Sequence, residues 1–534
     1  MLTLTYLKDN QELKTNDSNQ DLELIIKKDV NHTVVSVKAL AEIKLVDAKL
    51  DTDIKIKDND LMFLNGYQSW TDTAEVDLSF KERNVTKLPK FLVNAFGFDR
   101  YGDPLIYNYD KNKLHGYDCF YIRGEAEYFS YSLNVNKAYL VYEINKADKS
   151  LTLTSMCLNK KLASGEEFNL FDYLEFASIE EGINSLHQTY PHRECEKVFG
   201  YTSWYNYYQN INEEIILRDL EGLDSRFNLF QIDDGYETYV GDWKDIDPAK
   251  FPNGLADIVN KIHQKGYKAG IWLAPFVAET KSKLFSERKD LLKMVDGAPV
   301  SCGGNWSGFY ALDMQNPDTL AYIKECLEYY IDLGFDFFKL DFLYAASLPL
   351  YEGLTRAEMA EKSYAFIKEV LKDKLVLGCG AIPFNSANKF EYLRIGPDVS
   401  LIFDDIWYMK HMHRERISTK VTLQNTIYRS IFNNHLFLND PDVFLLRDDN
   451  IKLSAKQKEA LLTINSLFGS VLMTSDNIGS YDDAKKDLLE KAFEMFYQST
   501  DKSYKKDGNY ILISYKLEGK VYNLKYNTLK GVME

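Results

Sequence analysis

The first 188 residues show the two-residue alternation of apolar and polar positions that is typical of β-strands. The alternating segments are rich in β-branched residues, and turns of Asn, Asp and Lys separate them: Leu22–Lys28, His32–Leu40, Asp53–Lys57, Ala138–Asn145 and Ser150–Leu158. A helical period is not evident in this region. We therefore expect an N-terminal β-sandwich over residues 1–188.

The pattern changes near Phe199, where short apolar runs alternate with helical stretches such as Asn212–Leu223 and Arg356–Leu371. This alternation is typical of a parallel sheet whose strands are buried on both faces. The predicted strands are eight, the number that closes a (β/α)8 TIM barrel: Phe199–Tyr205, Asn228–Asp234, Lys268–Pro275, Phe335–Asp341, Lys374–Gly380, Glu391–Gly396, His435–Asp440 and Ser470–Asp476. We predict a catalytic barrel over residues 189–480.

The last part of the chain carries one further helical stretch, Ala484–Tyr497, and then β-type alternation over Tyr510–Tyr526. These features predict a small C-terminal antiparallel β-domain over residues 481–534. The expected fold class is thus multidomain, with a β-sandwich, a central barrel and a C-terminal β-domain.

Charge and cysteine usage narrow the function classes. The net charge of −16, without a block of Lys or Arg, argues against nucleic acid or an anionic membrane as partner. The six cysteines are scattered without a CxxC pair, so a disulfide framework or a structural zinc site is not expected. The N-terminus lacks the features of a signal peptide, and no apolar run reaches transmembrane length. We expect a cytoplasmic protein; its oligomeric state is not predicted.

Cofactor motifs are also missing from the predicted strand ends. Neither a dinucleotide fingerprint nor a P-loop follows any of them, so we expect no cofactor. The triplet His411–His413 is the only histidine cluster in sequence, and it lacks matching ligands elsewhere. We interpret it as a solvated loop and expect no metal.

The strongest single signal is Asp341, which ends the apolar run Phe335–Phe342. An ionised carboxylate is costly to bury, and the C-terminal ends of barrel strands open onto the active-site face. Asp341 is therefore the candidate for the central catalytic group. Taken alone, an Asp that caps the following turn is an equally ordinary reading of this strand.

Other polar and aromatic residues fall at corresponding strand ends: Trp204, Tyr205, Asp233, Asp234, Trp272, Lys339, Cys379, Arg394 and, shortly afterwards, Asp398. A barrel mouth lined by acids and Trp suits a neutral sugar. Retaining glycoside hydrolysis needs two carboxyls about 5–5.5 Å apart, and Asp341 and Asp398 are the natural pair.

Each of the remaining candidates has a structural alternative. Lys339 shares a strand face with Asp341, so it can keep that carboxylate charged and bind a substrate hydroxyl, or it can form a structural ion pair. Asp233 and Asp234 can grip two vicinal hydroxyls or form the turn before Gly235. Cys379 lies in a GCG sequence, where a small residue also serves tight packing.

The chain resembles the α-galactosidases (melibiases) of glycoside hydrolase family 36, specifically their compact bacterial type. The motifs that carry the resemblance occur in this order: GYTSWY, FQIDDGYE, GDW with FPNGL, GIWLAPF, FKLDF, LGCG, LRIGPD and LNDPD. They cover about Gly200 to Asp476, and NGYQSW at Asn65–Trp70 extends the likeness weakly into the β-domain. The resemblance implies a β-supersandwich, a (β/α)8 barrel and a C-terminal β-domain.

The resemblance also implies residue roles. It makes Asp341 the nucleophile and Asp398 the acid/base of a retaining exo-acting enzyme that removes terminal α-linked galactose from oligosaccharides such as melibiose and raffinose. Asp233 and Asp234 would hold the O4 and O6 region of galactose, the same subsite would be lined by Trp272, Lys339, Cys379 and Arg394, and Trp204 would form its wall.

Trp70 is the residue on which sequence and resemblance disagree. From the sequence alone it is a core or interface anchor of the β-domain, whereas the resemblance places a partly exposed indole over the barrel mouth. Two functional alternatives stay open: an α-N-acetylgalactosaminidase or galactosyl-transferring relative, and a catalytically silent sugar-binding protein.

Overall fold

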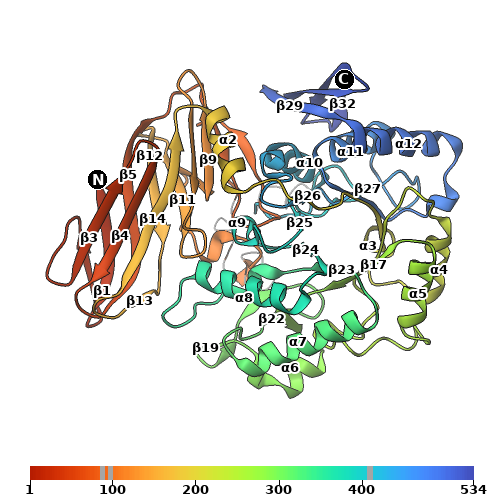
Figure 1. The fold of residues 1–534 in the computed structure, drawn as a ribbon, viewed down its shortest axis with the longest axis horizontal. Helices are drawn as coiled ribbons and strands as arrows, with labels where there is room; N and C mark the ends of the chain where they lie inside the picture. Colours follow the sequence, from red (N-terminus) through yellow and green to blue (C-terminus); the bar gives the residue numbers. More distant parts are fainter. Residues whose placement is uncertain (84–88, 90, 94–99, 406–412) are drawn as a thin grey trace.

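The computed structural model describes residues 1–534 except 84–88, 90, 94–99 and 406–412. The described residues form N-terminal antiparallel sheets, a central parallel sheet surrounded by helices, and a C-terminal antiparallel sheet (Figure 1). None of the helices in these residues combines the length and apolar character needed to cross a membrane.

The N-terminal part consists of two seven-stranded antiparallel sheets. The first has the order β2-β1-β5-β12-β11-β8, with β13 beside β5: β1 (Leu2–Lys8), β2 (Gln11–Thr15), β5 (Ile43–Lys55), β8 (Lys113–Tyr117), β11 (Tyr139–Asn145), β12 (Ser150–Met156) and β13 (Lys161–Leu162). The second has the order β3-β4-β14-β10-β9-β6-β7: β3 (Leu22–Lys28), β4 (His32–Ala39), β6 (Leu61–Leu64), β7 (Ala74–Val76), β9 (Cys119–Arg123), β10 (Tyr128–Ser132) and β14 (Glu167–Phe176).

Alternating side chains explain why these two sheets pack face to face. Leu4 and Leu45 from the first sheet and Val37 and Phe120 from the second are fully buried in one shared core. Because successive side chains of a strand point to opposite faces, the polar positions between them face outward. The predicted N-terminal β-sandwich is confirmed, including strand β3 over the predicted bounds Leu22–Lys28.

The central sheet contains nine parallel strand segments in the order β26-β25-β24-β23-β17-β16-β15-β28-β27. Their bounds are β15 (Val198–Thr202), β16 (Leu229–Ile232), β17 (Lys268–Leu273), β23 (Phe337–Leu340), β24 (Leu375–Gly378), β25 (Tyr392–Arg394), β26 (Leu438–Asp440), β27 (Val443–Phe444) and β28 (Val471–Thr474). Each predicted barrel strand overlaps at least one of these segments. The TIM-type barrel predicted from the alternation is thereby confirmed.

The seventh strand is interrupted, because β26 and β27 are separated only by Pro441 and Asp442. Segment β26 pairs with β25, whereas β27 pairs with β28 on the other side. The amide of Ser470, directly before β28, also donates to the carbonyl of Asn439 in β26 at 2.8 Å. The two segments together act as one strand that closes the parallel sheet into a barrel.

Helices connect the barrel strands and cover the outside of the sheet (Figure 1). They are α4 (Glu213–Gly222), α5 (Ala256–Gln264), α7 (Pro317–Asp332), α8 (Arg356–Leu371), α9 (Pro383–Ser386), α10 (Thr419–Tyr428) and α11 (Ala455–Phe468). Helix α8 begins with a capping box in which Thr355 and Glu358 satisfy each other's backbone amides. Helix α2 (Ile179–Thr189) leads from the N-terminal sheets into the barrel.

Two additions complete the described chain. Between β17 and α7 lie β18 (Val277–Glu279), α6 (Lys283–Glu287), β19 (Met294–Val295), β20 (Ala298–Pro299), β21 (Ser301–Gly303) and β22 (Phe309–Ala311). At the end lie α12 (Asp483–Gln498) and the sheet of β29 (Thr500–Asp507), β30 (Tyr510–Leu517), β31 (Lys520–Asn527) and β32 (Val532–Met533). The predicted C-terminal antiparallel sheet is confirmed.

One local prediction is wrong. The sequence run Phe199–Tyr205 suggested that Trp204 and Tyr205 end the first strand, but β15 stops at Thr202 and both residues belong to the short helix α3 (Trp204–Tyr207). Their aromatic character continued the apolar run, which hid the turn at Ser203.

Candidate active site

A cavity of about 340 Å³ lies at the carboxyl ends of the barrel strands. Its wall combines acids, Trp side chains and a few cations: Trp70, Tyr101, Trp204, Asp233, Asp234, Trp272, Asn305, Trp306, Lys339, Asp341, Phe342, Pro397, Asp398, Asp405, His413, Glu415, Arg416 and Ile417. A volume of this size is typical of a small-molecule site. Eight of the eleven residues predicted from the sequence belong to this lining.

Asp341 follows β23 directly, and both of its carboxylate oxygens are held by the protein. Oδ2 accepts from the indole Nε1 of Trp272 at 3.0 Å, and Oδ1 accepts from the backbone amide of Phe342 at 2.8 Å. Phe342 has a positive φ of 54°, which is uncommon for an aromatic residue and is found mainly at constrained sites. The carboxylate is therefore fixed in one orientation before any ligand arrives.

The charge state of Asp341 reflects several opposing effects. Burial raises the pKa of Asp341 above its ordinary value, and the negative charge of Asp398 adds to this increase. The cation of Lys339 and the hydrogen bond from Trp272 lower the pKa. The charge of Asp398 thus acts on the carboxyl of Asp341.

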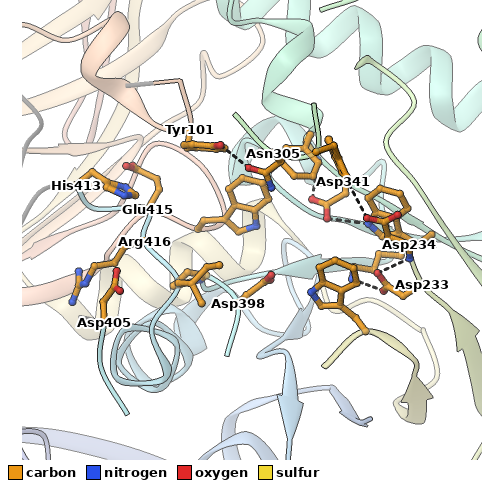
Figure 2. A pocket seen from close by; sticks show the side chains of 18 residues that line it. Tyr101, Asp233, Asp234, Asn305, Asp341, Asp398, Asp405, His413, Glu415 and Arg416 are labelled. Atoms are coloured by element: carbon orange, nitrogen blue, oxygen red, sulfur yellow. Dashed lines mark hydrogen bonds and ion pairs between the residues drawn. The ribbon is translucent and has the colours of Figure 1, made fainter. Parts of the chain in front are cut away.

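Asp398 enters the cavity from the loop after β25, on the other side of the space in front of Asp341. Figure 2 shows both carboxyl groups turned toward that space. The side chain of Asp398 is 31% exposed, and its Oδ1 accepts from Nη1 of Arg394 at 2.9 Å. The predicted pair of strand-end carboxyls thus lies in one cavity, with one buried member and one that water can reach.

Asp233 and Lys339 form a buried ion pair on neighbouring parts of the wall. Nζ of Lys339 lies 2.7 Å from Oδ2 of Asp233, and the same oxygen accepts from Gln231 and Thr202 at 2.7 Å and 3.1 Å. Burial opposes the charge of Lys339, but the Asp233 carboxylate outweighs it and raises the pKa of Lys339. Lys339 therefore binds Asp233 directly and influences Asp341 only through its field.

Asp234 lies beside this pair and is held from the opposite side. Its oxygens accept from Nε2 of Gln209 at 3.1 Å and 3.2 Å, and Oδ2 also accepts from Nε1 of Trp306 at 2.9 Å. Burial raises the pKa of Asp234 and, more strongly, that of the neighbouring Glu237, whose pKa the charge of Asp234 raises further. These two carboxyls consequently compete for one proton.

Trp70 comes from the N-terminal sheets and covers the cavity. It is only 9% exposed, and it packs edge-on against Phe342 and Tyr344 with ring centroids 5.1 Å and 5.8 Å apart. A Cβ atom at Gly380 would come within 3.1 Å of its indole, so the glycine leaves room for the ring. Trp70 is therefore both an interface anchor and a wall residue, and the expectation of a partly exposed indole is wrong.

Three predicted site residues lie behind the wall. Cys379 is 1% exposed and accepts a hydrogen bond from Nε1 of Trp70 at 3.3 Å. Tyr205 and Arg394 are 1% and 3% exposed, and both belong to a polar cluster behind Asp398. A role for them in direct substrate contact stays a prediction, while their support of lining residues is evident from these contacts.

Several lining residues were not among the sequence candidates. Tyr101 donates from its hydroxyl to Oδ1 of Asn305 at 2.6 Å and accepts from the amide of Gly304 at 3.0 Å. This pair fastens the N-terminal part to the loop that carries Trp306. The signal for this loop was the run SCGGNW, in which a Trp follows glycines between two barrel strands.

His413 contradicts the interpretation of His411–His413 as a solvated loop. It is 6% exposed and lines the cavity, and burial together with the charge of Arg416 lowers its pKa to about 4. His411 and Met412 lie outside the described residues. The neighbouring Glu415 also lines the cavity and accepts from Oγ1 of Thr71 at 2.8 Å. An alternating polar sequence concealed this burial, because the segment packs beneath the N-terminal sheets.

Comparisons with known proteins agree with this architecture. The solved α-galactosidase TtGalA of Thermus thermophilus, in complex with p-nitrophenyl α-D-galactopyranoside, superposes with a TM-score of 0.71 at 24% identity, covering 94% of this chain and 99% of that one. Alpha-galactosidase 1 of Pediococcus pentosaceus is 26% identical over 36% of this chain and 28% of its own length. Alpha-xylosidase XylQ of Lactiplantibacillus pentosus is 30% identical over 24% of this chain and 18% of its own length.

The two curated relatives are thus matched over less than a third of their own length. Residues 189–389 match the family model described as Melibiase, a range that includes Asp233, Asp234, Lys339 and Asp341. Over this range the chain is similar to the melibiase family.

Proposed function

We propose that the protein is a retaining, exo-acting α-galactosidase. The observation that carries the proposal is the pairing of two carboxyls in one cavity: Asp341 buried and fixed by two donors, and Asp398 partly exposed on the opposite side. A retaining glycosidase needs one carboxylate that attacks and a second that exchanges protons with the leaving group and with water. The unequal exposure of Asp341 and Asp398 suits these two tasks.

Asp341 serves as the nucleophile in this proposal. Its carboxylate attacks the anomeric carbon, the bond to the leaving oxygen breaks, and a galactosyl ester forms on Asp341. Trp272 and the amide of Phe342 keep the carboxylate oriented, which reduces the reorganisation needed in the transition state.

Asp398 serves as the acid and then as the base. It gives its proton to the leaving oxygen in the first step and takes a proton from the attacking water in the second. Its 31% exposure provides the access to water that the second step requires.

Lys339, Asp233 and Asp234 have hydrogen-bonding capacity left for sugar hydroxyls. The ammonium of Lys339 has three donors, of which the ion pair with Asp233 uses one. The carboxylate of Asp234 lines the cavity and supplies acceptor oxygens there. These groups supply both donors and acceptors, as recognition of a hydroxyl-rich ring requires.

The substrates we propose are terminal α-galactosides of oligosaccharides such as melibiose and raffinose. Relatives support this class: TtGalA has been solved with stachyose, and a variant of AgaA from Geobacillus stearothermophilus with raffinose. A cavity of about 340 Å³ that is closed by Trp70 from the N-terminal sheets favours binding of one terminal sugar over an internal one.

The test is a product-resolved screen of the purified protein with melibiose, raffinose and the nitrophenyl α-glycosides of galactose, N-acetylgalactosamine and xylose. We expect the enzyme to release galactose first as the α-anomer, and proton NMR can monitor the anomeric configuration of the product. Preference for the N-acetylgalactosaminide or the xyloside would replace the galactosidase proposal. Binding without turnover would support the silent sugar-binding alternative.

A further inference from the structure

We propose that Asp440 and Asp442 are positioning residues for Asp398. Acting through Arg394, they hold its carboxyl in place and set the pH range over which it keeps the proton that it donates. This inference rests on the acid/base role proposed above for Asp398.

The contact geometry joins three carboxylates to one guanidinium. Nε of Arg394 lies 2.8 Å from Oδ2 of Asp440, Nη2 lies 2.8 Å from Oδ1 of Asp442, and Nη1 lies 2.9 Å from Oδ1 of Asp398. The side chains of Asp440 and Asp442 are 1% and 0% exposed, so both act from the interior. Arg394 uses a separate nitrogen for each partner, which fixes the guanidinium plane and thereby the direction from which it reaches Asp398.

The interruption of the seventh barrel strand gives Asp442 a second contact with the Asp398 loop. Asp442 lies between β26 and β27 with a positive φ of 74°, and its amide donates to Oδ1 of Asp440 at 2.8 Å. Its own Oδ2 accepts from the amide of Val399 at 2.7 Å. The backbone that directly follows Asp398 is therefore attached to the same carboxylate that orients Arg394.

The electrostatic consequence concerns the acid step. A single Arg at hydrogen-bond distance stabilises the ionised form of a carboxyl, which disfavours a group that has to donate a proton. Here two further carboxylates share that cation. Burial raises the pKa of Asp442 to about 7, the charges of Asp398 and Asp440 add to this effect, and Arg394 opposes it. One cation thus serves three acids.

A purely structural role would give the same contacts, so the test must report on charge. Asp442→Asn is the suitable variant, because Asn tolerates a positive φ and retains an oxygen that accepts from Val399. The substitution removes one negative charge near Arg394. Arg394 then acts more strongly on Asp398, which loses its proton more readily. We expect the alkaline limb of kcat/KM for raffinose to move to lower pH by about one unit.

Asp476→Asn is a matched control. Asp476 is another fully buried acid after a barrel strand, but it pairs with Nη1 of Arg447 at 2.8 Å and accepts from the amide of Leu446 at 2.6 Å. Its loss should lower the melting temperature without moving the alkaline limb.

The outcomes separate this inference from the proposed function. A downward shift in Asp442→Asn, absent in Asp476→Asn, supports the inference. An active parent enzyme with the same alkaline limb in both variants overturns it and leaves the proposed function intact. A parent enzyme that hydrolyses no α-galactoside overturns the proposed function and this inference together.

Discussion

Trp70 of the N-terminal sheets donates its indole N–H to Sγ of Cys379 in the barrel at 3.3 Å, across a separation of 309 residues in the chain. The two residues join a wall of the cavity to the turn after β24. Two parts of the chain that are distinct in sequence pattern therefore build one site.

The first prediction concerns Trp70→Ala. Because the indole is only 9% exposed, its removal should lower the free energy of unfolding by about 3–5 kcal/mol and also open the cavity, which should raise KM for α-galactosides. Thermal unfolding and steady-state kinetics measure the two effects. Trp70→Phe retains the packing but not the hydrogen bond, and should show the smaller loss of stability. An unchanged KM in the Ala variant would restrict Trp70 to the interface.

The second prediction concerns the nucleophile. A slow fluorinated galactosyl substrate should form a stable ester with Asp341. Fluorine on the sugar slows both the formation and the hydrolysis of the ester, whereas a good leaving group speeds only its formation, so the ester accumulates. Mass spectrometry of the digested protein should find the label on the peptide that contains Asp341. A label on another acid would refute the assigned role.

The third prediction concerns Asp398→Ala. Substrates with good leaving groups should lose far less activity than raffinose, since only poor leaving groups depend on protonation. Added azide should restore turnover and give α-galactosyl azide, identified by NMR. Equal loss on all substrates, or a β-azide, would argue against Asp398 as the acid/base.

Much of the fold was predictable because it rests on local patterns. Buried parallel strands are short apolar runs, and the strand-end acids Asp341 and Asp233 are read directly from them. The direction of a side chain at a strand end is decided by packing, however, so the sequence did not separate the lining residue Lys339 from Arg394 behind the wall. The proposed boundaries near residues 188 and 480 stay predictions.

The residues that the sequence did not indicate lie in loops. Three of them, Tyr101, Trp306 and Glu415, reach the cavity only because distant segments pack together. The hydrophobic periodicity of a segment does not predict contacts with distant segments. His413 was misread for the same reason. Its polar neighbours suggested a solvated segment, whereas they form ion pairs and hydrogen bonds under the N-terminal sheets.

The fourth prediction concerns pH and stability. His115 is fully buried, with Nδ1 2.8 Å from Glu82 and Nε2 2.5 Å from Asp103, and these acids raise its pKa to about 9 against the cost of burial. A pKa raised in the folded state stabilises the fold below pH 6.5 and loses this effect as pH rises to about 9. The parent should therefore lose about 3 kcal/mol over that window, and His115→Gln should lose much less. Denaturant unfolding at several pH values measures the difference; identical slopes would show that His115 does not titrate there.

The fifth prediction concerns Arg429, which is fully buried and binds no carboxylate among the described residues. Its guanidinium donates to Oδ1 of Asn65 at 3.1 Å and to the carbonyls of Ser69 and Ile395 at 2.6 Å and 2.9 Å. Burial and the charge of Arg414 lower its pKa to about 9, and its hydrogen bonds go to neutral amide and carbonyl oxygens.

Arg429 thus fixes the turn before Trp70 against the barrel. Arg429→Lys keeps the charge but cannot reach all of these acceptors, since Lys has three donors on a single nitrogen. Each buried acceptor that loses its partner costs about 1–3 kcal/mol, so we expect a clear fall in melting temperature. We also expect KM for raffinose to rise severalfold while kcat changes less, because Trp70 is displaced and Asp341 is not. The Asn65→Ala variant removes one acceptor of the same set and should show a smaller change in the same direction. If Arg429→Lys lowers the melting temperature but leaves KM unaltered, Arg429 stabilises the interface without positioning Trp70.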